Sequence, residues 1–288
     1  ARTTAFKSVR YDEVAMERRG VEVESYDLTG LLARYKKMND GDALVKAWDE
    51  RLHAAMRFDG APDYAAGTLA RLGATLQTFV DDNSLGAVAL RCWTELQDEL
   101  HIAPCSLLGC LNMMGVPAAC ETDVSNVYPM AALHAASQGS VACCDLNNNY
   151  GSDPNKLILF HCGPVPVDMM TGPGNIEEHK MFVKTSGENC SWGLNVGRIK
   201  PGLITFAGGR TDNGECQFYM STGEVTTDEI EAAYFGTPGV MRSDALQRKL
   251  QNICYGGFRH HTTFTFGDWE RAIDEALVKY LGYTRIDI

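Results

Sequence analysis

Apolar residues recur at helical spacing in the first part of the chain and also fall into short runs between turns. Helices are predicted from this spacing over residues 28–38, 42–56, 63–82 and 106–114. The short runs, bounded by Gly, Pro or Asn, predict strands, although such a run does not by itself exclude a helix. These strands are predicted over residues 21–26, 84–93, 116–120 and 140–144. We therefore predict an α/β domain over residues 1–154, built on a mostly parallel, Rossmann-like sheet.

The pattern changes after residue 155, where Gly and Pro become frequent and apolar residues alternate with polar ones. Alternation between turn residues predicts short strands joined by hairpins. The strands are predicted at residues 163–170, 179–185, 190–199, 202–210, 215–225 and 260–269. A helix over residues 269–281 is expected to close the chain, and Gly208-Gly209 is expected at a bend. We predict an antiparallel β-barrel-like domain over residues 155–288, with a sandwich as the alternative.

Three apolar runs in the middle of the chain each end in a side chain that can bind a metal ion. Residues 115–120 precede Glu121, residues 139–144 precede Asp145, and residues 156–160 precede His161. The segment between the first two runs has the length and composition of a crossover helix, so strand, helix and strand predict a right-handed βαβ unit. The carboxyl ends of such strands open on one crevice, where we expect the three side chains to converge.

Two carboxylates with one or two imidazoles suit a divalent cation such as Mn²⁺, Mg²⁺, Co²⁺ or Fe²⁺, because oxygen ligands favour the harder ions. Acids at strand ends also commonly cap the following helix, and either Glu121 or Asp123 could have that role here. For any single residue both interpretations are open. The occurrence of three such residues at three strand ends favours a metal site.

Polar residues near these strand ends are candidate ligand-binding groups. Asn147, Asn149 and Tyr150 follow Asp145 on a loop where amide groups can hold a polar ligand, and an Asn-rich turn is the alternative. His260 and His261 stand before a predicted strand. Neighbouring residues on a strand face opposite sides, so only one of these two imidazoles is expected to reach a given site.

Charge and composition exclude several classes of protein. The formal net charge of -11 argues against nucleic acid or anionic membrane as a partner, and no run of apolar residues is long enough to span a bilayer. Most of the 10 cysteines lie inside apolar runs, as small buried hydrophobic residues do. With no paired CxxC motif and no signal peptide, we expect a cytoplasmic protein. The chain does not begin with Met, and we expect that it starts at an internal junction through processing or truncation.

Several motifs together resemble the L-fucose isomerase family and its L-arabinose isomerase relatives. They are Cys120-Glu121-Thr122-Asp123-Val124, the strand that ends in Cys144-Asp145-Leu146, Phe160-His161-Cys162-Gly163, and His260-His261 before a Phe-rich strand and Gly267-Asp268-Trp269. Residues 6–28 resemble the beginning of the family's second domain. Residues 197–210 and 221–225 resemble its C-terminal barrel domain, and the order and spacing agree through most of the chain.

The resemblance implies roles for individual residues. It implies that Glu121, Asp145 and His261 bind the metal ion, and that His161 occupies a position that binds metal in the arabinose branch. It also implies Mn²⁺, or another divalent cation such as Mg²⁺ or Co²⁺, as the cofactor. The implied activity is that of an intramolecular oxidoreductase that interconverts an aldose and a ketose. Glu121 and Asp145 would serve as acid and base around a cis-enediol, and which of them is the base is open.

The resemblance also implies partners. A sugar is the expected substrate, although the sequence does not identify which one, and Asn147, Asn149 and Tyr150 are the candidate residues that hold its hydroxyl groups. Family members carry a further α/β domain before the second one, so a missing N-terminal domain or partner chain is expected, together with a homo-oligomer, either a trimer or a hexamer. Two alternatives stay open: a non-catalytic sugar-binding relative or regulatory subunit, and a metal-dependent lyase that acts on a hydroxy-carbonyl compound.

Overall fold

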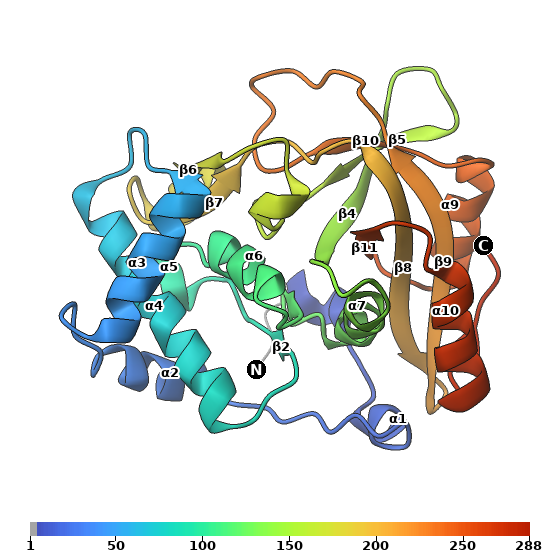
Figure 1. Cartoon of the computed structure of the whole chain (residues 1–288), viewed down its shortest axis with the longest axis horizontal. Coiled ribbons are helices and arrows are strands. Elements are labelled where there is room, and N and C mark those ends of the chain that lie inside the picture. Colours follow the sequence, from blue (N-terminus) through green and yellow to red (C-terminus); the bar gives the residue numbers. More distant parts are fainter. Residues whose placement is uncertain (1–4) are drawn as a thin grey trace.

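The computed structural model describes residues 5–288 and shows a mixed α/β protein with one large mixed sheet (Figure 1). The order of strands in this seven-stranded sheet is β10-β5-β4-β11-β8-β9-β12. The strands are β4 (Ala142–Asn149), β5 (Lys156–Phe160), β8 (Gly202–Asp212), β9 (Glu215–Val225), β10 (Gly239–Arg242), β11 (His261–Phe266) and β12 (Thr284–Arg285). All neighbours pair antiparallel except β12 with β9. Because β10 also pairs with β9, the strands other than β12 form a closed ring of hydrogen-bonded neighbours.

One side of this sheet carries an apolar core that the long strands share with α9 (Leu246–Tyr255). Phe206 of β8, Tyr219 of β9 and Phe264 of β11 are fully buried in it, and Leu246 and Ile253 pack against it from α9. Strands β8 and β9 lie close to the predicted strands at residues 202–210 and 215–225. Because alternate residues of a strand point to the same face, each of these two strands contributes the side chains of one face to this core. The burial of these large aromatic side chains stabilises the closed ring of strands.

The other side of the sheet is covered by α7 (Val124–Ser137), with α1 (Glu13–Glu17), α10 (Glu270–Asp274) and the π-helical turn η3 (Glu275–Tyr280) beside it. Gly208 and Gly209 lie inside β8 and not at a bend, so that prediction is wrong. A Cβ at Gly209 would lie 2.1 Å from the carbonyl oxygen of Ser125 in α7. The missing side chain therefore allows α7 to approach the sheet closely.

The helical part of the molecule lies on the left of Figure 1. It contains α2 (Leu28–Tyr35), α3 (Ala43–Ala55), α4 (Asp63–Asp82), α5 (Glu95–Leu100) and α6 (Cys105–Met113), and its core surrounds the fully buried Trp48. A small sheet of β1 (Met56–Arg57), β6 (Gly174–Glu178) and β7 (Trp192–Val196) borders these helices. The predicted helices at 28–38, 42–56, 63–82 and 106–114 are confirmed.

Three predicted strands are wrong. Residues 21–26 form no strand. Residues 163–170 contain the 3-10 turn η2 (Val167–Met169), and Pro164 and Pro166 explain this because proline cannot donate to a strand ladder. Residues 179–185 belong to α8 (Lys180–Ser186), in which Phe182 is the buried residue. A short run of consecutive apolar residues has no periodicity that distinguishes a strand from a helix.

The predicted βαβ unit around α7 is also wrong. β3 (Ala118–Ala119) pairs in parallel with β2 (Val88–Ala89) in a separate two-stranded sheet, whereas β4 pairs antiparallel with β5 and β11 in the large sheet. Helix α7 thus connects two different sheets. A Rossmann-like parallel sheet is not confirmed, and the barrel-like arrangement and the boundary between residues 154 and 155 stay predictions.

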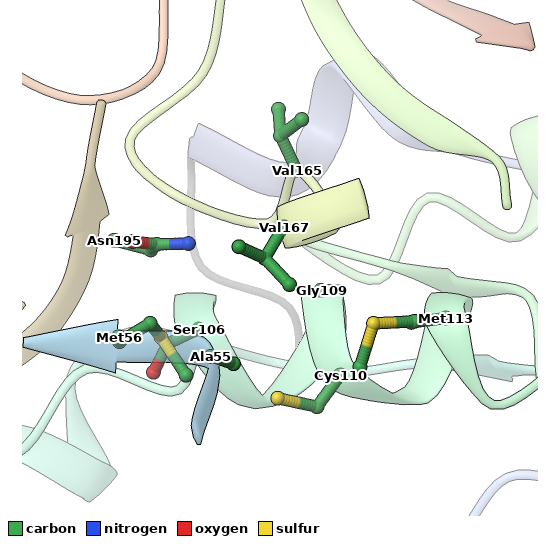
Figure 2. Close-up of a pocket in the computed structure, with 9 residues that line it drawn as sticks. All are labelled: Ala55, Met56, Ser106, Gly109, Cys110, Met113, Val165, Val167 and Asn195. Atoms are coloured by element: carbon green, nitrogen blue, oxygen red, sulfur yellow. The ribbon is translucent and has the colours of Figure 1, made fainter. Parts of the chain in front are cut away.

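Among the described residues, no helix has the length and apolar character needed to cross a membrane. Figure 2 shows a small cavity beside α6, with a volume of about 10 Å³. Two of the residues that line it, Ser106 and Asn195, each have a buried side-chain oxygen with no hydrogen-bond partner in the described part of the chain. A cavity of this size with two polar groups suits one water molecule and is too small for a sugar.

Candidate metal centre

Glu121 stands at the end of the short strand β3 in an unusual backbone conformation. Its φ is 60°, and that of Thr122 is 56°, so two consecutive residues with side chains adopt the left-handed region. This conformation is uncommon outside glycine and costs free energy, and it often marks functional sites. The Glu121 side chain is only 17% exposed and approaches His261. Burial raises the pKa of this carboxyl group.

Asp145 and His261 face each other across the antiparallel pair of β4 and β11, where they are direct partners in the register. His261 Nε2 lies 3.3 Å from Asp145 Oδ1 and 3.6 Å from Glu121 Oε2. The structure therefore brings together the three residues that the sequence singled out. The distances are close to those between ligand atoms that share one cation, since two bonds of about 2.1 Å meet at such an ion.

His161 lies next to this group. It follows Phe160, which is the register partner of Asp145, and its ring centroid is 5.6 Å from that of His261. Asp145, His161 and His261 offer ligand atoms that all lie within 4.8 Å of one another. His161 Nδ1 accepts a hydrogen bond of 2.9 Å from the backbone N–H of Cys162, which leaves Nε2 as the atom for a ligand bond.

His260 is nearer to the site than the sequence predicted. Its Nε2 lies 3.5 Å from Asp145 Oδ1, and it forms a group of possible ligands with Glu121 and His261. The prediction that only one of the two imidazoles reaches the site is wrong, because β11 begins at His261 and strand alternation does not apply to the residue before it. His260 is 48% exposed, so it lies at the solvent side of the centre.

Asp123 is a site residue whose contact with His261 the sequence did not predict. It is fully buried, and its Oδ2 accepts a hydrogen bond of 2.8 Å from His261 Nδ1. It also caps α7 by accepting from the backbone N–H of Asn126, so the helix-cap interpretation is confirmed for Asp123 and not for Glu121. Metal-binding histidines usually donate their second N–H to a carboxylate, and an acid two residues from a candidate ligand was the available signal.

A chain of hydrogen bonds ties Asp123 to the large sheet. The Asn126 side chain donates to Asp123 Oδ2, and its Oδ1 accepts a hydrogen bond of 2.9 Å from the backbone N–H of Gly209 in β8. The Arg259 guanidinium lies 3.9 Å from Asp123 Oδ1. Asp123 is thereby fixed relative to β8 and β11, and it fixes the orientation of the His261 ring.

The charges of the centre are strongly coupled. Burial lowers the pKa of His261, but the hydrogen bond with Asp123 and the charges of Asp123, Asp145 and Glu121 outweigh burial and raise this pKa to about 9. Burial, opposed by His261 and assisted by Glu121, raises the pKa of Asp145 to about 6. Carboxylates at such positions repel each other unless a positive charge lies between them.

Three buried atoms at this centre have no hydrogen-bond partner among residues 5–288: Asp145 Oδ1, His161 Nε2 and His261 Nε2. Buried polar atoms are nearly always satisfied, so a group of them that points to one place requires an explanation. A divalent cation would satisfy all three and would neutralise the two acids. The donor set of oxygen and imidazole nitrogen fits Mn²⁺ and similar ions.

The predicted sugar-binding residues have other partners. Asn147 Oδ1 accepts from the backbone N–H of Asn148. Asn149 Oδ1 accepts a bond of 3.1 Å from Gln247 at the far end of β4, and Tyr150 OH donates a bond of 2.8 Å to the carbonyl oxygen of Glu229. Their role in holding a sugar stays a prediction. Glu229 lines a cleft of about 690 Å³, and none of the candidate metal ligands lines this cleft.

Comparisons with known proteins find that this chain is similar to sugar isomerases. Residues 159–287, which include His161 and His261, match the family model described as L-fucose isomerase, C-terminal domain. The sulfoquinovose isomerase of Alkalicoccus urumqiensis is 23% identical over 262 residues, which cover 89% of this chain and 56% of the relative. That of Priestia aryabhattai is 20% identical over 207 residues, which cover 72% of this chain and 45% of the relative.

The chain spans about half the length of the curated relatives that it matches. Two independent comparisons, one with a domain model and one with whole proteins, agree on sugar isomerases. Residues 159–287 of the chain are therefore similar to the C-terminal domain of L-fucose isomerase.

Proposed function

We propose that the chain forms the metal-binding portion of an aldose–ketose isomerase. The observation that supports this most strongly is the approach of Glu121 and Asp145 to the same nitrogen of His261, at 3.6 Å and 3.3 Å. In this proposal Glu121, Asp145 and His261 hold a divalent cation, Mn²⁺ or a similar ion, and His161 is a further ligand. Asp123 orients His261 from behind.

The two acids carry the proton transfers. When bound, the cation supplies polarisation of the substrate's carbonyl group and of the adjacent hydroxyl group. One of Glu121 and Asp145 removes the proton from the carbon beside the carbonyl, and the other delivers a proton to the carbonyl oxygen, which gives a cis-enediol. The first acid then returns its proton to the former carbonyl carbon, while the second takes the proton of the neighbouring hydroxyl group, whose oxygen becomes the new carbonyl oxygen. Burial moves the pKa of both acids toward neutrality, which suits groups that must take up and release protons.

Sulfoquinovose is the first substrate to test, because the names of the curated relatives state that sugar. We propose a panel of sulfoquinovose, L-fucose and L-arabinose with the purified chain, alone and together with any polypeptide encoded beside it. Formation of a ketose in the presence of Mn²⁺, and its loss with a chelator, is the expected result. Binding of a sugar without conversion would favour a sugar-binding role, and formation of smaller carbonyl fragments would favour a lyase.

We infer further that residues outside the chain complete the sugar pocket, in a homo-oligomer such as a trimer or a hexamer. The side chains of Asp145 and His260 are 23% and 48% exposed, so one side of the centre is open to solvent. Proton transfer at carbon is protected best in a closed site. Light scattering of the purified protein measures the oligomeric state, and a monomer at working concentration would contradict this inference.

The affinity for Mn²⁺ is expected to rise with pH. Because the pKa of His261 is about 9, this ring is protonated at neutral pH in the metal-free protein, and the cation must displace one proton. Below pH 6 the Asp145 carboxyl, with a pKa of about 6, must lose a second proton. Affinity should therefore increase about tenfold per pH unit between pH 7 and 8 and more steeply below pH 6.

Calorimetry in two buffers with different ionisation enthalpies counts the protons released on Mn²⁺ binding. His53→Gln, which changes an exposed histidine far along the chain on α3, is the matched control and should leave the profile unchanged. An affinity that does not change between pH 7 and 8 would show that the cation does not displace a proton from His261.

A further inference from the structure

Four cysteine thiols form a chain of contacts beside the candidate metal centre. Cys162 Sγ lies 3.4 Å from Cys105 Sγ. Cys105 and Cys92 each make a side-chain contact with Cys120. Cys162 directly follows His161, and the other three thiols are almost fully buried. The arrangement joins the end of β5 to the first residue of α6 and to the end of β3.

These thiols do not have the geometry of a second metal site. Among the described residues, the groups of possible ligands whose atoms lie within 4.8 Å of one another include no set of three of these cysteines. A structural zinc site requires four ligands around one point. A chain of pairwise contacts suits thiol–disulfide chemistry between two neighbours instead.

We propose that Cys105 and Cys162 form a reversible disulfide, so that a redox-sensitive bond lies one residue from His161. A disulfide bond is about 2.0 Å long, so the two sulfurs must approach by roughly 1.4 Å from their contact of 3.4 Å. Cys162 is partly exposed on the loop after β5, whereas Cys105 is only 2% exposed. The oxidant therefore reaches Cys162 first, and Cys105 closes the bond.

The chemistry requires a small-molecule disulfide as the oxidant. The Cys162 thiolate attacks one sulfur of this oxidant, which breaks its S–S bond, forms a mixed disulfide on Cys162 and releases one small thiol. Cys105 then attacks Cys162 Sγ, which forms the protein disulfide and releases the second small thiol. The two protein thiols lose two electrons and two protons, and the oxidant takes up both.

The geometry favours the second step, because the two sulfurs are already 3.4 Å apart. Once the mixed disulfide forms, Cys105 is already in contact and replaces the small thiol.

The bond would alter the metal centre, a consequence that depends on the proposed function. Cys162 Sγ lies 3.2 Å from His161 Nδ1, and the Cys162 backbone N–H also donates to that atom. Movement of the sulfur toward Cys105 removes the first contact and changes the support of the His161 ring. Changes in the groups that support metal-binding histidines alter affinity by about 10-fold or more.

Peptide mapping tests the disulfide independently of any enzymatic activity. The reduced full chain is equilibrated in glutathione buffers of increasing oxidised fraction, free thiols are blocked, and the digest is analysed by mass spectrometry. We expect a peptide that links Cys105 to Cys162, absent from Cys105→Ser and Cys162→Ser and retained in Cys254→Ser, which changes an exposed thiol. Cys105→Ser should accumulate glutathione on Cys162. No link, or a link from Cys105 to Cys120, would overturn the proposal.

A second measurement compares Mn²⁺ affinity before and after oxidation. We expect about a 10-fold loss on oxidation, its reversal by a reducing agent, and no response in Cys162→Ser. A cross-linked protein with unchanged affinity would refute the effect on the metal centre. If the reduced protein binds no Mn²⁺ at all, the proposed function fails, whereas the cross-linking result still decides the disulfide.

Discussion

Glu121→Gln is expected to lower kcat/KM for isomerisation by about 10³-fold or more, because it removes both a metal ligand charge and a proton-transfer group. Glutamine has nearly the same shape as glutamate, and the Glu121 side chain is only 17% exposed, so the packing around it should be kept. The loss should therefore appear in turnover and Mn²⁺ affinity, with little change in the melting temperature. Assays at saturating Mn²⁺ separate the two contributions.

The matched control for this substitution is Glu99→Gln, the same chemical change at an exposed position on α5. It should leave kcat/KM and Mn²⁺ affinity unchanged. If Glu121→Gln keeps the rate of the unmodified protein, Glu121 is neither a ligand nor an acid or base, and the proposed mechanism loses one of its two acids. Asp145→Asn then becomes the decisive variant.

The sequence led to candidate residues that the structure brings together, but the predicted reason for their convergence was wrong. Strand ends pointed to Glu121 and Asp145, and the resemblance to the L-fucose isomerase family pointed to His261. The expected parallel βαβ geometry does not exist, because β3 and β4 lie in different sheets. The side chains meet instead through the antiparallel pair of β4 and β11 and the left-handed turn at Glu121. Pairing of strands so far apart in sequence depends on tertiary packing, which local patterns do not encode.

The helices of the first half were predicted well, since amphipathic spacing over 10 or more residues is a strong local signal, as in α3 and α4. Several short elements were predicted wrongly. Residues 179–185 became α8 and residues 21–26 formed no strand, because a few apolar residues fit several structures equally well. Gly208-Gly209 was wrongly assigned to a bend, because the groups that require these glycines come from elsewhere in the sequence. A Cβ at Gly208 would meet the Tyr219 ring, and one at Gly209 would meet Ser125 of α7.

Asp123 illustrates the same limit at the site itself. Its partner His261 is 138 residues away in the sequence, so the pattern around Asp123 indicated only its local role as a helix cap. The structure shows both roles in one carboxylate: Oδ1 caps α7, and Oδ2 accepts from His261 Nδ1. The start of α7 and the orientation of the candidate metal ligand are therefore fixed by the same residue.

Asp123→Asn is expected to weaken Mn²⁺ binding by about 10- to 100-fold, because the carboxylate that orients His261 loses its charge. In the metal-free protein the same change leaves the buried His261 imidazolium without the carboxylate that accepts its hydrogen bond, which should cost about 3–5 kcal/mol of stability. The pKa of His261, about 9 with Asp123 present, should fall. An NMR titration of the His261 ring in the metal-free protein measures this shift.

The titration distinguishes a positioning role from general destabilisation, since a loss of packing alone would not lower the pKa of one imidazole. Asn126→Ala is the graded comparison: it removes the bonds to Asp123 and to Gly209 but keeps the carboxylate, so Mn²⁺ affinity should fall less and the His261 pKa should stay raised. Asp98→Asn, an exposed acid on α5, should change neither quantity. If Asp123→Asn binds Mn²⁺ as tightly as the unmodified protein, the carboxylate does not support the metal centre, and its burial serves the cap of α7 alone.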